Sequence, residues 1–286
     1  MRPEDVPVAE RISADAFHAV DLDRRRVGDR PPERRPAARS QRWIDRTTGF
    51  LRTDGPGCWV AEVEDRVVGF ATSFRRETLW CLATFAVEPG HQGHGLGRLL
   101  LDAAGRHASG CLRAMLAASE DPRALRRYVA AGFDLHPQLT LRGIPDASAA
   151  PSLASVREAV PGDRDEMDSL DRRVRGAARN DADHEALRAA GRPLVSTTRS
   201  ASGYAYVDET GSVLALAASD RRTASRLLWA ALLTAPAEVE VHHLTSANQW
   251  ALQVGVAAGL AVGTEGHLGV RGMRPPSPYV HHGALL

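Results

Sequence analysis

The residues with the clearest chemical potential form a glycine-rich turn behind an apolar segment. Leu82–Val87 is apolar, and the turn Gln92–Gly97 follows it closely. Leu96, Leu99 and Leu100 then repeat at helical spacing and predict a helix with one buried face. A strand that leads through glycines into a helix can bind phosphate, because bare N–H groups close on the anion and the helix dipole adds positive potential.

The spacing of these glycines excludes two common phosphate loops. A Walker A loop needs a lysine behind its glycines, and the order G-H-G-L-G does not give the dinucleotide pattern G-x-G-x-x-G. The pattern that fits is Q-x-x-G-x-G at Gln92, Gly95 and Gly97, preceded by V-x-P at Val87 and Pro89. By itself, this pattern is also compatible with an ordinary glycine-rich strand-to-helix connection.

A second segment reduces that ambiguity. Asp121 can cap a helix that has Pro122 in its first turn, and Gly132 can end the helix in a left-handed cap. The segment follows the pattern N-x-x-A-x-x-x-Y-x-x-x-G-F, with Asp121 in place of Asn. The residues in register are Ala124, Tyr128, Gly132 and Phe133. Together, the two segments resemble the coenzyme A-binding segments of the GNAT superfamily of N-acetyltransferases.

The resemblance implies an enzyme that transfers an acetyl group from acetyl-CoA to a primary amine by direct attack in a ternary complex. The acceptor would be a small-molecule or peptide amine, which the sequence does not identify. A splay between two parallel strands would free the N–H of Val87 to polarise the thioester carbonyl. The residues implied to bind coenzyme A are Phe85, Ala86, Val87, Gln92, Gly93, His94, Gly95, Leu96, Gly97, Arg98 and Asp121.

Three residues are candidates for proton transfer. The resemblance places the Tyr128 hydroxyl near the coenzyme sulfur as a general acid, although a packed aromatic side chain is the alternative interpretation. Glu62, which we expect on the central strand, and Glu88, behind the expected bulge, are candidate bases that would act directly or through water. Either could instead be an ordinary surface carboxylate. His91 and His94 border the loop, and we expect them to face solvent.

An internal duplication is visible in the second half of the chain. A shift of 127 positions carries Asp121 onto Asn248 and Gly132 onto Gly259. The same shift puts Gly255 where the first copy has Tyr128. The glycine turn is replaced by Asp220–Ser225, which has no glycine, so coenzyme binding by the second copy is not expected. We expect this copy to brace the first or to shape its acceptor cleft.

These observations predict a mixed α+β protein with two tandem GNAT-like folds, each a mostly antiparallel sheet flanked by helices. The predicted domains are residues 1–144, an intact acetyltransferase domain, and 156–286, a degenerate copy, joined by the linker 145–155. The sequence begins almost inside the first helix. Either the first copy lacks the opening strand that is usual in the family, or the start codon has been placed too far downstream. Its expected elements are a helix over 4–20, strands over 58–63, 67–73 and 79–87, a helix over 96–108, a strand over 112–118, a helix over 122–129 and a strand over 138–142.

Composition narrows the functional classes further. The chain has 286 residues, 43% of them hydrophobic, and a net charge of +1, so neither nucleic acid nor a membrane surface is an expected partner. The arginine-rich stretch 21–46 could bind an acidic substrate, but interspersed acids favour a solvated loop with a short helix. We also expect a cytoplasmic monomer rather than a dimer, with three reduced cysteines. The pairs His242-His243 and His281-His282 lack spaced ligands, so no metal is assigned.

Two other functional classes remain open at this stage. The chain could be a non-catalytic module that binds acyl-CoA and acts through a partner, with the second copy as its docking surface. A nucleotide-binding Rossmann-like domain is a further possibility. The short meander before the glycine turn argues against it, as does the lack of an acidic ribose ligand in a second βαβ unit.

Overall fold

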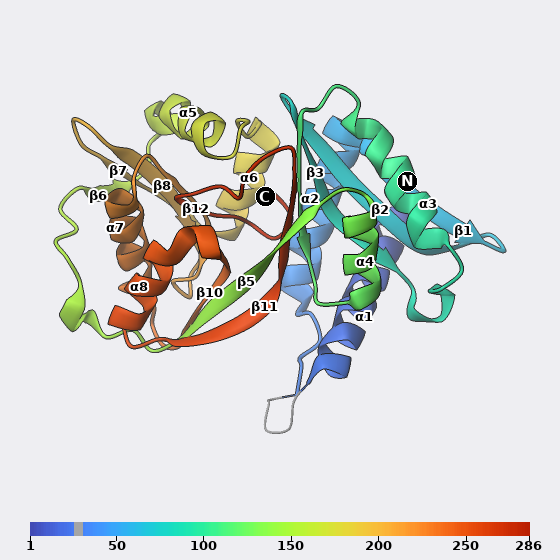
Figure 1. The fold of residues 1–286 in the computed structure, drawn as a ribbon, viewed down its shortest axis with the longest axis horizontal. Coiled ribbons are helices and arrows are strands. Elements are labelled where there is room, and N and C mark those ends of the chain that lie inside the picture. Colours follow the sequence, from blue (N-terminus) through green and yellow to red (C-terminus); the bar gives the residue numbers. More distant parts are fainter. Residues whose placement is uncertain (26–30) are drawn as a thin grey trace. The chain divides into compact units, whose positions relative to one another are not determined.

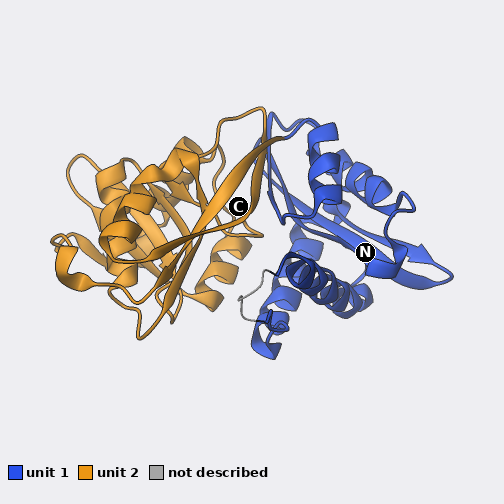
Figure 2. Ribbon diagram, turned by 60° about the horizontal axis from the view of Figure 1, so that its bottom comes forward, with its two compact units in different colours: residues 1–133 blue, residues 134–286 orange. Residues whose placement is uncertain are grey.

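The computed structural model describes residues 1–25 and 31–286, which form two compact units, Met1–Phe133 and Asp134–Leu286 (Figure 2). Part of the arginine-rich stretch, including Asp29, lies outside the described residues. The rest of that stretch is more helical than expected, because the first helix extends to Arg24 and the second has 18 residues. None of the described helices combines the length and hydrophobicity that a membrane span requires.

Unit 1 follows the predicted order of elements closely (Figure 1). They are α1 (Val6–Arg24), α2 (Ala37–Asp54), β1 (Cys58–Val63), β2 (Arg66–Arg76), β3 (Leu79–Val87), α3 (Leu96–Gly105), β4 (Arg113–Ala118) and α4 (Pro122–Ala130). The strands lie in the order β1-β2-β3-β4. The pairs β1–β2 and β2–β3 are antiparallel, and β3–β4 is parallel, as predicted.

The helices of unit 1 cover opposite faces of its sheet, because successive side chains of a strand point to opposite sides. Phe70 and Ala86, which are paired across β2 and β3, pack with Trp43 of α2 and with the buried side chains of α1. On the other face, a Cβ added to Gly69 would meet Leu100 of α3 at 3.2 Å. Thus α1 and α2 form one layer, the strands the middle layer, and α3 the opposite layer.

One strand lies differently from the expectation. Glu62 was expected on a central strand, but β1 pairs with β2 alone among the described strands of unit 1 and is therefore an edge strand. The cause is the opening of this unit, where residues 1–25 and 31–57 contain helices and no strand that could cover β1.

Unit 2 contains one five-stranded sheet and a separate group of three strands (Figure 1). Its elements are β5 (Asp134–Gly143), β6 (Val156–Glu158), α5 (Arg164–Val174), α6 (Asp181–Ala190), β7 (Arg192–Thr197), β8 (Ser202–Val207), β9 (Val213–Ala218), α7 (Arg221–Leu232), β10 (Val239–Thr245), α8 (Gln249–Ala257), β11 (Ala261–Arg271) and β12 (Tyr279–Val280). The sheet has the order β12-β9-β8-β7-β6. The chain is thus a mixed α+β protein with mostly antiparallel strands flanked by helices.

The strand expected at 138–142 lies in unit 2. It is part of β5, which pairs antiparallel with both β10 and β11. The compact units therefore divide at Phe133, ahead of β5, whereas the sequence places the end of the first domain at residue 144. Leu141 of β5 joins the core that α7 and α8 bury, which explains why the strand belongs to this unit.

Candidate active site

The two parallel strands of unit 1 separate beside the glycine turn. Their pairing runs from Leu79 opposite Arg113 to Leu82 opposite Leu116 and then stops. The register between β2 and β3 shifts at the same place, so that Ala83 is an extra residue on β3. A bulge bends its strand and disrupts the ladder, so the rest of β3 has no pairing with β4. The predicted splay is present.

The N–H of Val87 points into this gap. The N–H of Glu88 donates to the carbonyl of Val68 at 2.8 Å, so Val87 and Gly69 form the non-hydrogen-bonded type of antiparallel pair. In such a pair, both backbone polar groups face away from the partner strand. Of the two backbone polar groups of Val87, the carbonyl accepts a bond from Gln92 Nε2 at 2.9 Å. The N–H remains available.

The two residues before Val87, Phe85 and Ala86, differ in the direction of their backbone N–H groups. The backbone N–H of Phe85 faces the gap, as the N–H of Val87 does. Ala86 is hydrogen-bonded to β2 through Phe70, so its own N–H is already used. Of these two predicted coenzyme contacts, only Phe85 presents a free backbone donor.

The glycine turn presents a series of unpaired N–H groups at the start of α3. Gly93 and Gly95 both have φ of 87°, a left-handed conformation that other residues adopt only with strain. Within the described chain, the N–H groups from Gly93 to Gly97 have no acceptor. The two ends of the predicted run differ, because Gln92 N–H donates to Pro89 at 3.4 Å and Arg98 N–H donates to Gly95 at 2.9 Å.

The first turn of α3 has the properties of an anion site. Its N-cap residue is Gly95, which has no side chain to satisfy the free donors. Unsatisfied N–H groups and the positive end of the helix dipole coincide there. Gly97 brings the helix close to its neighbours, because an added Cβ would meet the Phe85 ring at 3.2 Å and Arg127 at 3.4 Å.

The helix that carries Tyr128 begins and ends as the sequence predicts. The carboxylate of Asp121 accepts a bond from the N–H of Arg123 at 2.9 Å, with Pro122 in the first turn. At the other end, Gly132 has φ of 82°. The N–H of Phe133 donates to the carbonyl of Tyr128 at 3.0 Å, which together with the bond from Gly132 forms a Schellman motif.

The Tyr128 side chain lies between two aromatic rings. It is 5% exposed, and its ring centroid lies 6.4 Å from that of Phe85 and 6.4 Å from that of Phe133. Because Phe85 points to the face that α3 covers, this contact also places α4 on that face. Burial raises the pKa of Tyr128, so the hydroxyl stays protonated at neutral pH. Among the described residues, the hydroxyl has no hydrogen-bond partner, and it is not one of the polar atoms sealed from solvent.

The remaining predicted residues are spread around the gap. The Asp121 carboxylate also pairs with Arg123 at 3.1 Å. Glu88 directly follows Val87 and lies 3.0 Å from His91 and 3.8 Å from Arg66. Glu62 is exposed near the end of β1, two strands from β3, and neighbouring strands lie about 4.8 Å apart. Glu62 is therefore separated from Val87 by about two strand spacings, whereas Glu88 is the next residue of the chain.

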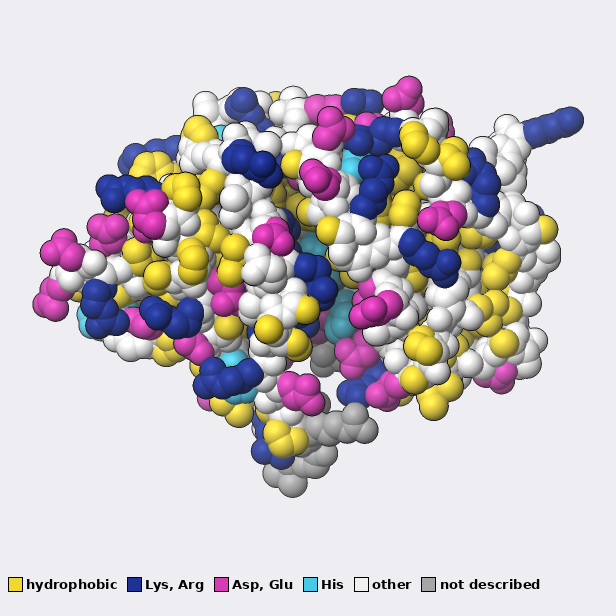
Figure 3. Space-filling view, turned by 180° about the vertical axis from the view of Figure 1, so that it is seen from behind, with side chains coloured by type: hydrophobic (Ala, Val, Ile, Leu, Met, Phe, Trp, Pro, Cys, Tyr) yellow, Lys and Arg dark blue, Asp and Glu magenta, His cyan; other side chains and the backbone are white. Residues whose placement is uncertain are grey.

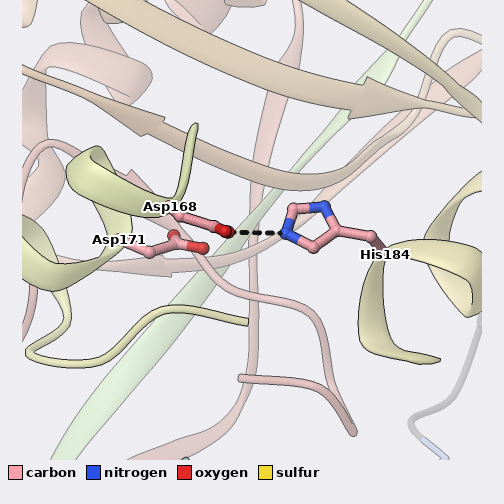
Figure 4. A group of neighbouring side chains, drawn as sticks. All are labelled: Asp168, Asp171 and His184. Carbon is pink, nitrogen blue, oxygen red and sulfur yellow. Dashed lines mark hydrogen bonds and ion pairs between the residues drawn. The ribbon is translucent and has the colours of Figure 1, made fainter. Parts of the chain in front are cut away.

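One cluster was missed by the sequence interpretation. Asp168, Asp171 and His184 of unit 2 place a ligand atom each within 4.8 Å of one another (Figure 4). These atoms already have partners. Asp168 bonds His184 at 3.1 Å, and Asp171 bonds Arg179 at 2.7 Å. Burial, together with the nearby guanidinium charges of Arg179 and Arg164, lowers the pKa of His184 to about 3. The group is therefore a buried hydrogen-bond network, and it does not present free ligands to a metal.

One family of known proteins matches part of this chain. Residues 21–133 match the sequence model of the acetyltransferase (GNAT) family. No curated protein matches the chain.

Solved structures resemble the whole chain at low sequence identity. A Pyrococcus horikoshii protein, provisionally named an acetyltransferase, aligns with a TM-score of 0.73 and 17% identity over 100% of this chain and 93% of that one. A GCN5-related N-acetyltransferase of Sphaerobacter thermophilus gives 0.56 and 18%, over 95% and 93% of the two chains. A tandem GNAT protein from the clavulanic acid biosynthesis pathway gives 0.51 and 15%, over 93% and 94%.

Proposed function

Because residues 21–133 match the sequence model of the acetyltransferase (GNAT) family, we propose that this protein is an N-acetyltransferase that uses acetyl-CoA and a primary amine. The observation that carries the proposal is the run of free N–H groups from Gly93 to Gly97, which begins α3 beside the gap in the sheet. A pyrophosphate fits these donors, because it offers several negative oxygens to closely spaced amides. The same feature argues against a binding site built on side-chain cations, since the free donors belong to the backbone.

The residues beside the gap would serve the acyl transfer itself. Acetyl-CoA supplies the acetyl group and a thiolate leaving group. The N–H of Val87 would donate to the thioester oxygen as negative charge develops there, and a donor of this kind contributes about 3–4 kcal/mol of barrier reduction. Burial raises the pKa of Tyr128, so its hydroxyl is protonated at neutral pH. It would donate this proton to the departing thiolate as a general acid.

The acceptor amine must lose a proton, and Glu88 is the nearer of the two carboxylates. It follows Val87 directly in the sequence, and it keeps its position through Arg66 and His91. We propose that Glu88 receives the proton through water, with Glu62 as the outer end of such a chain. Asp121 would act by capping α4 and thereby holding Tyr128.

The test is the steady-state release of thiol from acetyl-CoA with a panel of primary amines, for the wild type and Tyr128→Phe. We expect turnover by the wild type and a kcat about 100-fold lower in the variant, with little change in KM for acetyl-CoA. Calorimetry on both proteins provides the control, because the variant should still bind coenzyme A. Binding of coenzyme A without turnover of any amine would contradict the enzyme and favour an acyl-CoA-binding module.

A further inference from the structure

Arg127 of α4 lies against the first turn of α3. A Cβ added to Gly97 would come within 3.4 Å of both the Cζ and the Nε of Arg127. A Cβ lies about 2.5 Å from the nitrogen of its own residue, so the guanidinium lies within about 6 Å of the Gly97 nitrogen. The N–H of Gly97 is the last of the free backbone donors at the start of α3. A side chain of α4 thus reaches the turn that would hold the phosphates.

The guanidinium of Arg127 has neither a hydrogen bond nor an ion pair within residues 1–25 and 31–286. Arg123, one turn earlier on the same helix, is paired with Asp121 at 3.1 Å. Basic and acidic side chains are also interspersed on the face shown in Figure 3. Arg127 is half-buried, so it has lost part of its hydration without gaining an ion pair in return. Its charge is therefore available to a bound anion.

Arg127 and Tyr128 are consecutive residues of α4, and their side chains leave the helix about 100° apart. The guanidinium of Arg127 is directed to Gly97, whereas the ring of Tyr128 contacts those of Phe85 and Phe133. Burial raises the pKa of Tyr128, and the positive charge of Arg127 opposes part of this increase. The helix thus presents a cation to the glycine turn and a separate hydroxyl beside Phe85 of β3.

These observations, which rest on the proposed acetyltransferase function, add one residue to the coenzyme site. We propose that the Arg127 guanidinium forms an ion pair with the diphosphate of coenzyme A, whose oxygens the N–H groups from Gly93 to Gly97 hold. Backbone N–H groups and a helix dipole supply only partial positive charges, so they leave much of the negative charge of a diphosphate uncompensated. A guanidinium supplies a full charge and two parallel N–H donors that match two phosphate oxygens.

The test is calorimetry with coenzyme A and with dephospho-coenzyme A, which keeps the diphosphate but lacks the phosphate on the ribose. We expect Arg127→Gln to weaken the binding of both ligands by the same factor, about tenfold or more, because a charge-assisted hydrogen bond is lost. Arg127→Lys keeps the charge without the two parallel donors, so it should weaken binding less than Arg127→Gln does. Without ligand, Arg127→Gln should melt at the temperature of the wild type, because the guanidinium has no partner to lose.

Arg126→Gln is the matched control, because it removes the same charge from the preceding position of α4, where the side chain is exposed. Its affinity for both ligands should stay within about twofold of the wild type, since salt screens an exposed charge. Arg127 is excluded from the diphosphate site if Arg127→Gln binds both ligands as tightly as the wild type, if it weakens coenzyme A alone, or if Arg126→Gln loses as much affinity. In each of these cases the wild type still binds coenzyme A and the proposed function stands, whereas a wild type that binds neither ligand would contradict the proposed function itself.

Discussion

Helices α3 and α7 occupy corresponding places in the two halves of the chain, but their first turns differ. The start of α3 follows Gly95, and its N–H groups are free. The start of α7 follows Asp220, whose carboxylate accepts a bond from the N–H of Thr223 at 3.0 Å. Those bonds lower the pKa of Asp220 against the effect of burial, so a negative charge sits where a phosphate would have to lie. The contrast shows that an acidic N-cap closes a helix start to an anion, whereas a glycine N-cap leaves the N–H donors free.

The strands that precede these two helices also differ, because one has an unpaired edge and the other has a covered edge. In unit 1, β3 pairs with the parallel strand β4 only as far as Leu82. In unit 2, the corresponding strand β9 pairs with the short antiparallel strand β12, through Tyr279 opposite Ala217. The chain's own last strand thus covers the edge of β9.

The counterparts of Asp121 and Tyr128 take part in this closure. Asn248 accepts bonds from the N–H of Tyr279 at 3.0 Å and from Trp250 Nε1 at 2.9 Å. Gly255 stands where Tyr128 stands in α4, and a Cβ there would come within 2.3 Å of Leu141. In the second half, the residues at the positions of Asp121 and Tyr128 therefore serve the packing of its own core.

The largest effect is expected at Asn248, whose amide joins α8 to the C-terminal segment. Asn248→Ala leaves Trp250 Nε1, the Tyr279 N–H and the Pro276 carbonyl without their partner. Losing a buried network of this kind should lower the free energy of unfolding by about 4 kcal/mol. Urea unfolding measures the change. A loss of less than about 1 kcal/mol would contradict the role assigned to Asn248.

Acid should destabilise the protein through His184. The pKa of His184 in the native state is about 3, below its ordinary value of 6.5. Between these two pH values, the unfolded chain therefore binds a proton at His184 that the native chain does not bind. The contribution of His184 to the free energy of unfolding is complete well above pH 6.5 and is lost as the pH decreases. The slope approaches about 1.4 kcal/mol per pH unit, and the loss between pH 6.5 and 4.5 is about 2.3 kcal/mol.

Urea unfolding at several pH values tests this slope in the wild type and in His184→Gln. The variant should show a smaller slope over this range, even if it is less stable at neutral pH. His94→Gln, which changes an exposed histidine of the glycine turn, serves as the control and should keep the full slope. Equal slopes in all three proteins would rule out His184 as the source.

The free start of α3 should be sensitive to a single methyl group. Gly95→Ala places a Cβ at φ of 87°, which disfavours the conformation that aims the N–H groups at one anion. We expect binding of coenzyme A to weaken about tenfold or more, as measured by calorimetry. Gly90→Ala is the matched control in the preceding turn, where φ is not positive and an added Cβ meets nothing within 4 Å. Equal affinities for the two variants would refute the proposed site.

The smallest change in stability is expected at the start of α7, where Asp220 caps the helix. Asp220→Ala removes the N-cap of α7 and should lower the free energy of unfolding by about 1 kcal/mol, as measured in urea. It should not add a second coenzyme A site, because Thr223 and Ala224 are buried and no glycine frees the backbone. If calorimetry found two coenzyme A molecules bound per Asp220→Ala chain, Asp220 alone would be what prevents binding at the start of α7.

The sequence by itself determined the local features whose causes lie within a few residues. The glycines of the turn, the cap at Asp121 and the stop at Gly132 each act on their own helix or turn, so their roles could be predicted. The parallel pairing of β3 and β4 followed from the helix between them.

Only the tertiary structure decided the features that depend on distant segments. Among the described strands, β1 has β2 as its one neighbour, and the place of β5 depends on β10 and β11, more than 90 residues further along the chain. The packing of α1 against α2 likewise depends on contacts between separate helices, which no local pattern records. Long-range pairing and burial are properties of the whole packed unit, and they set the charges and free donors that a substrate would meet.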